Sequence, residues 1–169
     1  ATTLGTYPSV VVDADGDLAI VLAYGQEWRI GVQDPRQPGG HLAVLQLVGM
    51  DPSGSQRLGL ATSGTSVHRW SIGGRSGHHL IDPRTRQPAR TDVVQATVLA
   101  DSAGIAEMAA KSIVILGSRE GTTLMERPGV QAVIILTDRG HVQASPSALR
   151  LLAVSSWGRS HRTPPISGA

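Results

Sequence analysis

The chain has 169 residues, of which 40% are hydrophobic, so it can bury one sizeable core. Its formal net charge is only +2, and it has three Trp, two Tyr and no Phe, so we expect no nucleic-acid partner. Because the chain contains no Cys, a disulfide framework, a thiolate zinc site and a cysteine nucleophile are excluded. No apolar stretch approaches the roughly 20 residues of a membrane-spanning helix, so we expect no membrane span.

The first half of the chain has the pattern of short strands separated by turns. Two apolar runs between Ser9 and Leu22 are broken by the acidic residues 13–17, which predicts a hairpin. Other β-rich runs end at clusters of Gly, Pro and Ser. These runs predict further strands over residues 26–32, 41–48, 58–62, 67–72 and 91–99.

The hydrophobic period changes after residue 100. Ile105, Met108, Ser112 and Leu116 recur at three- and four-residue steps, which predicts a helix capped by Asp101 or Ser102 and ended by Gly117. A shorter helix is expected at about 118–127, followed by a strand over 130–136 and a short return strand.

These elements predict an α+β domain over residues 1–154, in which one long and one short helix pack on an antiparallel sheet. Residues 155–169 are rich in Ser, Gly, Arg and Pro, and predict a flexible tail. The expected core residues are Val12, Ile20, Ile30, Val44, Ile81, Val98, Ile105, Met108, Ile113, Leu116 and Ile134.

Two short sequences are the most specific features. Residues 61–64 read Ala-Thr-Ser-Gly, and residues 77–85 read Gly-His-His-Leu-Ile-Asp-Pro-Arg-Thr. Together they resemble the ATSG and H-I-I-D-P-R-T-G signatures of the FAD:protein FMN transferase family. Residues 28–35 and 15–18 resemble two further motifs of that family, W-R-I-G-I-x-D-P and G-G-D-I. The resemblance extends from about Val10 to Leu152 and implies the C-terminal half of a T-fold-like architecture.

The hydroxyl groups of Thr62 and Ser63, beside Gly64, could bind a polar ring or a phosphate, although the same residues also suit an ordinary strand-to-turn junction. His79 could move a proton or bind a flavin, whereas its alternative role is to pin a loop. His78 is expected to face the opposite side of the strand. The resemblance implies that the flavin contacts are Thr62, Ser63, Gly64, His79, Leu80 and Ile81, with His79 catalytic. It also shows one departure in the same loop, because Arg86 stands where the family has Gly.

Residues 106–112 lie where the family has the helix A-D-A-L-A-T-A, whose Asp and Thr hold a magnesium ion that bridges the FAD pyrophosphate. Here these two positions are Glu107 and Lys111. Glu107 could still bind a hard cation, but a protonated Lys111 cannot. Either the two form a surface ion pair and the metal site is lost, or the ammonium group of Lys111 replaces the metal opposite the pyrophosphate.

The resemblance implies binding of FAD, transfer of FMN to a Thr or Ser hydroxyl of an acceptor flavoprotein, and release of AMP. The alternative is a noncatalytic flavin-binding or interaction module with a degenerate metal site. The family draws other flavin contacts from an N-terminal half that has no counterpart in this sequence. Either that half is a separate chain or a cleaved piece, or the sequence is truncated, or the protein is a degenerate relative. The possible partners are thus a separate N-terminal half or a further copy of the chain in a homo-oligomer. The sequence leaves open whether the protein is exported or cytoplasmic.

Overall fold

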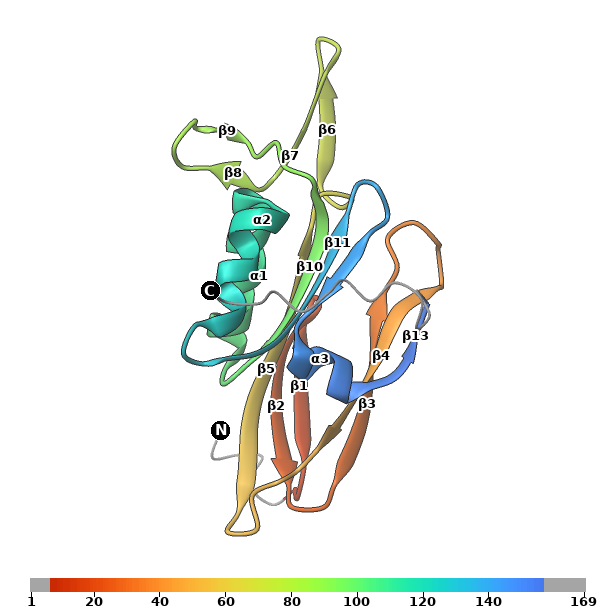
Figure 1. The fold of residues 1–169 in the computed structure, drawn as a ribbon, viewed down its shortest axis with the longest axis vertical. Helices are drawn as coiled ribbons and strands as arrows, with labels where there is room; N and C mark the ends of the chain where they lie inside the picture. Colours follow the sequence, from red (N-terminus) through yellow and green to blue (C-terminus); the bar gives the residue numbers. More distant parts are fainter. Residues whose placement is uncertain (1–6, 157–169) are drawn as a thin grey trace.

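The computed structural model describes residues 7–156, apart from the side chain of Arg75. Its main sheet has six strands in the order β1-β2-β5-β10-β11-β12, and all neighbours are antiparallel, as the sequence predicted (Figure 1). The strands are β1 (Val10–Ala14), β2 (Asp17–Ala23), β5 (Ser55–Gly64), β10 (Val93–Ala100), β11 (Val130–Thr137) and β12 (Val142–Ala144).

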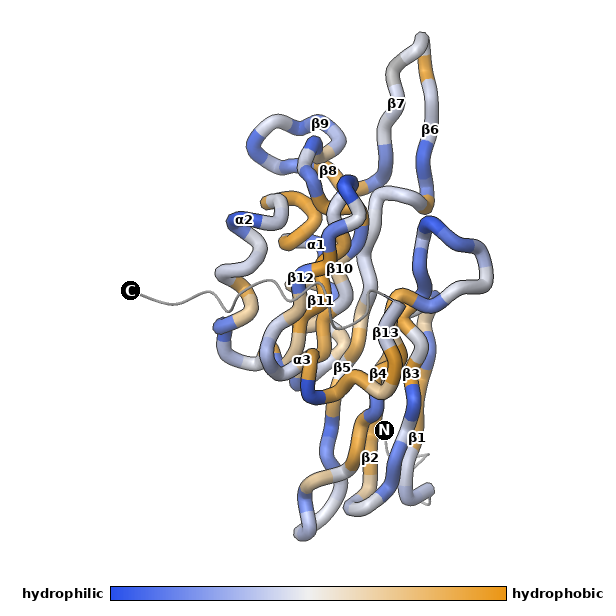
Figure 2. Tube along the Cα trace, turned by 45° about the vertical axis from the view of Figure 1, so that its right-hand side comes forward, coloured by the Kyte–Doolittle hydropathy of each residue, from blue (hydrophilic) through white to orange (hydrophobic). Residues whose placement is uncertain are grey.

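A second sheet covers one face of the first. It has the order β13-β4-β3 and is built from β3 (Glu27–Gln33), β4 (His41–Val48) and β13 (Leu152–Ser155). Leucines of β2, β4 and β5 meet between the two sheets and form the larger core, which follows the hydrophobic stretches of the chain in Figure 2. Alternate residues of each strand point into this core, as expected for a strand with two different faces.

Helix α1 (Ala103–Leu116) covers the other face of the main sheet and packs on β5 and β10 (Figure 1). The hydroxyl group of Ser102 caps the helix by accepting a hydrogen bond from the backbone N–H of Ile105. The side of α1 that faces the sheet is rich in alanine, so the helix lies close to the strands. At Gly59 of β5, an added Cβ would lie 2.0 Å from the backbone nitrogen of Ala103.

Two small hairpins extend from one end of the sheet (Figure 1). One joins β6 (Arg69–Ile72) to β7 (Arg75–His78), and the other joins β8 (Ile81–Asp82) to β9 (Gln87–Pro88). The expected short helix begins at residue 118 as α2 (Ser118–Gly121) and continues as the 3-10 helix η2 (Thr122–Glu126). None of the helices in the described part of the chain is long and apolar enough to cross a membrane.

Three of the expected core residues are instead exposed: Val12, Ile81 and Met108. Val12 lies on the edge strand β1 beyond the reach of α1, and Ile81 lies in a hairpin outside the main sheet. Met108 lies on the outer side of α1 because the buried stripe of this helix is made of smaller side chains. Those residues are Ala106, Ala109, Ala110, Ile113 and Val114.

A short helix, α3 (Pro146–Leu151), and strand β13 after it were not predicted. The hydroxyl group of Ser145 caps α3 and Pro146 occupies its first turn, a combination that could have been recognised in the sequence. Of the predicted tail, only residues 155 and 156 are described: Ser155 ends β13, and the backbone N–H of Ser156 donates to the carbonyl of Leu42. Residues 157–169 lie outside the described part of the chain.

Candidate functional site

The centre of the candidate site is an ion pair on the flank of α1. The ammonium group of Lys111 donates to Oε1 of Glu107, one helical turn earlier, and both side chains are about two-fifths exposed. Lys111 is the only lysine in the 169 residues. The pair lies beside the buried stripe of the helix, so its charges lie on the flank of α1 rather than in the core.

Asp17 adds a second carboxylate to this cluster. It begins β2, where Leu18 points between the two sheets, so the side chain of Asp17 points to the face that carries α1. Partial burial raises the pKa of the Asp17 carboxyl group, and the nearby charge of Glu107 raises it further, whereas Lys111 lowers it. The sequence analysis missed Asp17 as a site residue, because its position depends on the packing of α1 beside β2.

His79 approaches the same lysine from the hairpin end of the sheet. Its ring meets that of His68 edge to face, with centroids 5.2 Å apart and an interplanar angle of 80°. Partial burial lowers the pKa of His79, and electrostatic interactions with His68, His78 and Lys111 lower it further. The imidazole of His79 is therefore neutral at pH 7 and can accept a proton.

His78 has a different role from its neighbour. Its Nε2 lies 2.9 Å from the carbonyl oxygen of Ala89, and its Nδ1 accepts a hydrogen bond from the backbone N–H of Leu80 at 3.3 Å. With Nδ1 as the acceptor, Nε2 carries the proton and donates to Ala89. His78 thus pins two loop segments together, which is the structural role that had been considered for His79.

The Thr62-Ser63-Gly64 motif is divided between the two faces of β5. Thr62 shares the face of Leu60, and its hydroxyl oxygen lies 2.9 Å from that of Thr97. Ser63 shares the face of Ala61, on the side of α1, and is buried. An added Cβ at Gly64 would lie 2.9 Å from the carbonyl oxygen of Val94, so this position has no room for a side chain. Of the three, only Ser63 therefore points to the face that carries Lys111.

Leu80 and Ile81 also have different environments. Leu80 is buried in the core beneath α1, whereas Ile81 is exposed. In the turn that follows, the guanidinium group of Arg84 binds both oxygens of Asp82. Arg86 has a φ of 58°, so the loop has a left-handed residue where the family has Gly.

The residues at this site do not fit a magnesium ion. The carboxylate of Glu107 is bound to Lys111, and the ammonium group would repel a cation. In the described part of the chain, no three His, Cys, Asp or Glu side chains come together in a way that could hold a metal. The positive charge at this place is therefore supplied by Lys111.

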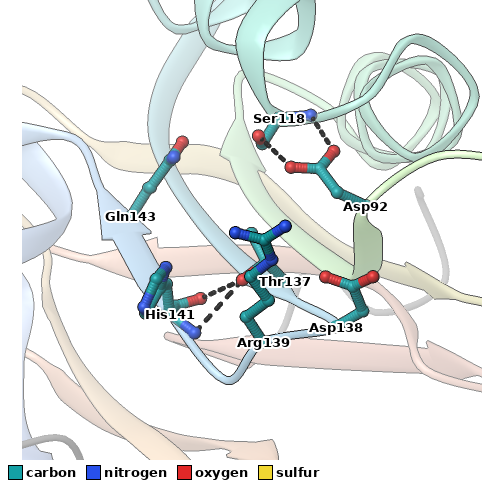
Figure 3. Close-up of a pocket in the computed structure, with 7 residues that line it drawn as sticks. All are labelled: Asp92, Ser118, Thr137, Asp138, Arg139, His141 and Gln143. Atoms are coloured by element: carbon teal, nitrogen blue, oxygen red, sulfur yellow. Dashed lines mark hydrogen bonds between the residues drawn. The ribbon is translucent and has the colours of Figure 1, made fainter.

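A separate polar cavity of about 250 Å³ lies between β10, α2 and the β11–β12 hairpin (Figure 3). Asp92 accepts hydrogen bonds there from the backbone N–H and the hydroxyl group of Ser118, at the start of α2. These bonds lower the pKa of the Asp92 carboxyl group although burial opposes them. The motif residues identified in the sequence do not line this cavity, so its polar groups belong to the packing of α2 rather than to the candidate site.

The layered fold, with α1 on one face of an antiparallel sheet, is that of a flavin-transferase-like protein. The sequence profile of the ApbE family matches residues 4–134, and the chain belongs to this family. It is 31% identical over 137 residues to an FAD:protein FMN transferase of Rhodobacter capsulatus, covering 80% of this chain and 24% of that protein. It is 32% identical over 148 residues to that of Treponema pallidum (strain Nichols), covering 81% and 39%.

Solved structures agree with this assignment. The ApbE protein of Thermotoga maritima superimposes with a TM-score of 0.68 at 24% identity, over 85% of this chain and 44% of that chain. The flavin transferase ApbE of Vibrio cholerae gives a TM-score of 0.56 at 26% identity, over 84% and 44%. The chain thus spans less than half the length of these relatives.

Proposed function

We propose that this chain supplies one side of an FAD site in a flavin transferase, with Lys111 facing the FAD pyrophosphate in place of a metal ion. The observation that carries the proposal is the grouping of Lys111 on α1 with a neutral imidazole, that of His79, whose pKa the charge of Lys111 helps to lower. Membership of the ApbE family supports FAD as the substrate.

The proposed reaction breaks one P–O bond and forms another. A Thr or Ser hydroxyl oxygen of an acceptor flavoprotein attacks the phosphorus of the FMN half of FAD, and the bond between that phosphorus and the bridging oxygen breaks. AMP leaves with the bridging oxygen, and FMN becomes attached through a phosphoester. His79 accepts the hydroxyl proton, because its lowered pKa keeps it neutral.

Lys111 would stabilise the charge that develops on the leaving phosphate. An ammonium group is a compact cation with three donors, so it can bind pyrophosphate oxygens directly. Its contact with Glu107 must then rearrange, or be shared, when the phosphate binds. Ser63 points to the face of β5 that carries α1, and it is proposed to contact the flavin side of the ligand together with the backbone beside Gly64, His79 and Ile81. Leu80 is buried beneath α1 and would support this loop from the core.

A noncatalytic flavin-binding module is the second candidate. It is favoured by the carboxylates of Glu107 and Asp17, which flank Lys111 and together outnumber its single positive charge, so the ionised cluster would repel a pyrophosphate. Such a module would bind FAD without releasing AMP. The two candidates are therefore separated by AMP release in the presence of an acceptor flavoprotein.

The single lysine allows a direct test of the proposed contact. The chain, and any natural version extended at its N-terminus, is treated with an amine-acetylating reagent, and acetylation of Lys111 is measured by peptide mass spectrometry. FAD and ADP should protect Lys111, whereas riboflavin, which has no phosphate, should not. Equal acetylation with and without FAD would contradict the proposal, and the α-amino group provides the internal control.

A further inference from the structure

The two projecting hairpins line a cavity of about 920 Å³ that is open to solvent. Trp70 and Ile72 of β6 line one side, and Pro88 and Arg90 of the β9 segment line the other. His78 joins the two sides through its hydrogen bond to the carbonyl of Ala89. The cavity thus lies beside the loop that carries His78, whereas the ring of the next residue, His79, contacts His68 and does not line the cavity.

The cavity has an apolar wall that is open to solvent. The ring of Trp70 lies so close to Gly77 that an added Cβ there would be 2.9 Å from the ring, and the same Cβ would lie 3.1 Å from Cγ of Pro88. Trp70 is nevertheless 41% exposed and Ile72 is 73% exposed. Such large apolar side chains in a projecting hairpin are typical of a surface that binds another molecule.

The same segment concentrates the positive charge of the chain. Residues 66–91 contain five arginines and one aspartate, which gives a net charge of +4, whereas the whole chain has +2. The aspartate, Asp82, is already bound by Arg84, so it does not offer a free carboxylate. The hairpin segment thus carries excess positive charge beside a cavity that has one apolar wall, and an anionic partner would complement this charge.

Strand β6 also offers backbone groups to a partner. In the described part of the chain it pairs only with β7, and all four of its residues are exposed. An isolated two-stranded hairpin is marginally stable in water, and a further strand added at its edge would stabilise it. These features suit an extended polypeptide better than a compact ligand.

We propose that the β6–β7 and β8–β9 hairpins bind an extended acidic polypeptide segment, with one apolar side chain of that segment in the cavity beside Trp70. Residues 157–169 of this chain are not the occupant, because they contain Arg159 and Arg162 and no acidic residue. The segment belongs to the acceptor flavoprotein, an assignment that rests on the proposed function. Strand β7 ends at His78, so a segment bound there would lie near the part of the chain that carries His79.

The experiment measures binding of a fluorescently labelled synthetic peptide, in which acidic and aliphatic residues surround one threonine, to the whole chain. A counterpart with lysine in place of the acidic residues and an oligothymidylate are the comparison probes. The test variants are Arg86→Glu combined with Arg90→Glu, and Ile72→Ser. The matched controls are Arg57→Glu and Met50→Ser, since Arg57 is also exposed, Met50 is 72% exposed, and neither lines the cavity.

We expect the acidic peptide to bind and the double charge reversal to weaken it by about tenfold, while both controls bind as the unchanged chain does. Equal binding of the lysine peptide, or equal weakening in the controls, would overturn the proposal. So would tighter binding of oligothymidylate that is lost in the same variants, because the partner would then be a nucleic acid.

FAD binding is measured in the same samples, so that the two proposals can fail separately. Peptide binding without FAD binding would support the docking surface and contradict the proposed function. FAD binding without peptide binding would overturn only the docking surface. Circular dichroism of each variant shows whether the fold is retained, and Ile72→Ser, at an exposed position, provides a second readout if the double variant does not fold.

Discussion

Lys111 binds the carboxylate of Glu107 one turn away on α1, at the two positions that the sequence resemblance matches to a metal-binding Asp and Thr. An exposed pair of this kind contributes only about 0.2–0.5 kcal/mol to helix stability. The contact is therefore weak enough for a pyrophosphate to compete for the ammonium group. The pair itself has no net charge, so an anionic ligand would be attracted only where the ammonium group of Lys111 turns from Glu107 toward it.

Exchanging this pair should change how the site binds FAD. The double variant Glu107→Asp with Lys111→Thr restores the family's residue types, so we expect its FAD affinity to become dependent on magnesium. Isothermal titration calorimetry with and without the metal measures this effect. Lys111→Thr alone is the control and should bind more weakly under both conditions. Indifference of the double variant to magnesium would count against the assigned positions.

Asp17 should destabilise the protein at neutral pH. Its folded-state pKa is raised above the ordinary aspartate value of 3.8, so any stability that it contributes is present below that pH and is lost as the pH rises through the raised pKa. Asp17→Asn should therefore raise the melting temperature at pH 7 by about 1–2 °C, with little change near pH 3. A fall in melting temperature at pH 7 would show that the carboxylate has a stabilising partner.

His68 should help to keep His79 neutral. Because the pKa of His79 is lowered, the free energy of folding that the neutral imidazole contributes is fully present above the ordinary value of 6.5. This contribution is lost as the pH falls through the folded-state pKa. His68→Asn keeps a residue that tolerates the φ of 51° and removes the ring contact, so the pKa of His79 should rise toward 6.5. NMR titration of the imidazole protons measures this shift. His141→Asn, at a distant exposed histidine, should leave it unchanged.

The close approach of α1 to the sheet should make Gly59 intolerant of a side chain. An added Cβ would overlap the backbone of Ser102 and Ala103, so Gly59→Ala should lower the free energy of unfolding by about 3 kcal/mol. Gly104→Ala is the matched control, since its Cβ would meet nothing within 4 Å. Because alanine favours helix, this change should stabilise by up to about 1 kcal/mol. Urea unfolding of both variants measures the difference.

The sequence predicted the main sheet and α1 because their hydrophobic periods are regular, and the hairpin of β1 and β2 agrees with the expected turn at residues 13–17. It placed Met108 in the core, although the buried stripe lies on another side of the helix and includes three alanines whose small size lets the helix approach the sheet. The sequence also showed that Glu107 and Lys111 stand at the two positions that the resemblance matches to metal ligands. The contribution of Asp17 was not visible, because it depends on which strand lies beside the helix. Neighbouring residues such as Thr62 and Ser63 face opposite sides of a strand, but only the fold shows that Ser63 is the one on the side of α1.

The central claim is that Lys111 supplies the positive charge that binds the FAD pyrophosphate. The most direct measurement is the FAD affinity of the chain, and of any natural version extended at its N-terminus, with magnesium and with EDTA, for the unchanged sequence and for Lys111→Ala. We predict equal affinity under both conditions and a loss of about tenfold or more in the variant. Binding that requires magnesium and is unaffected by Lys111→Ala would contradict the claim.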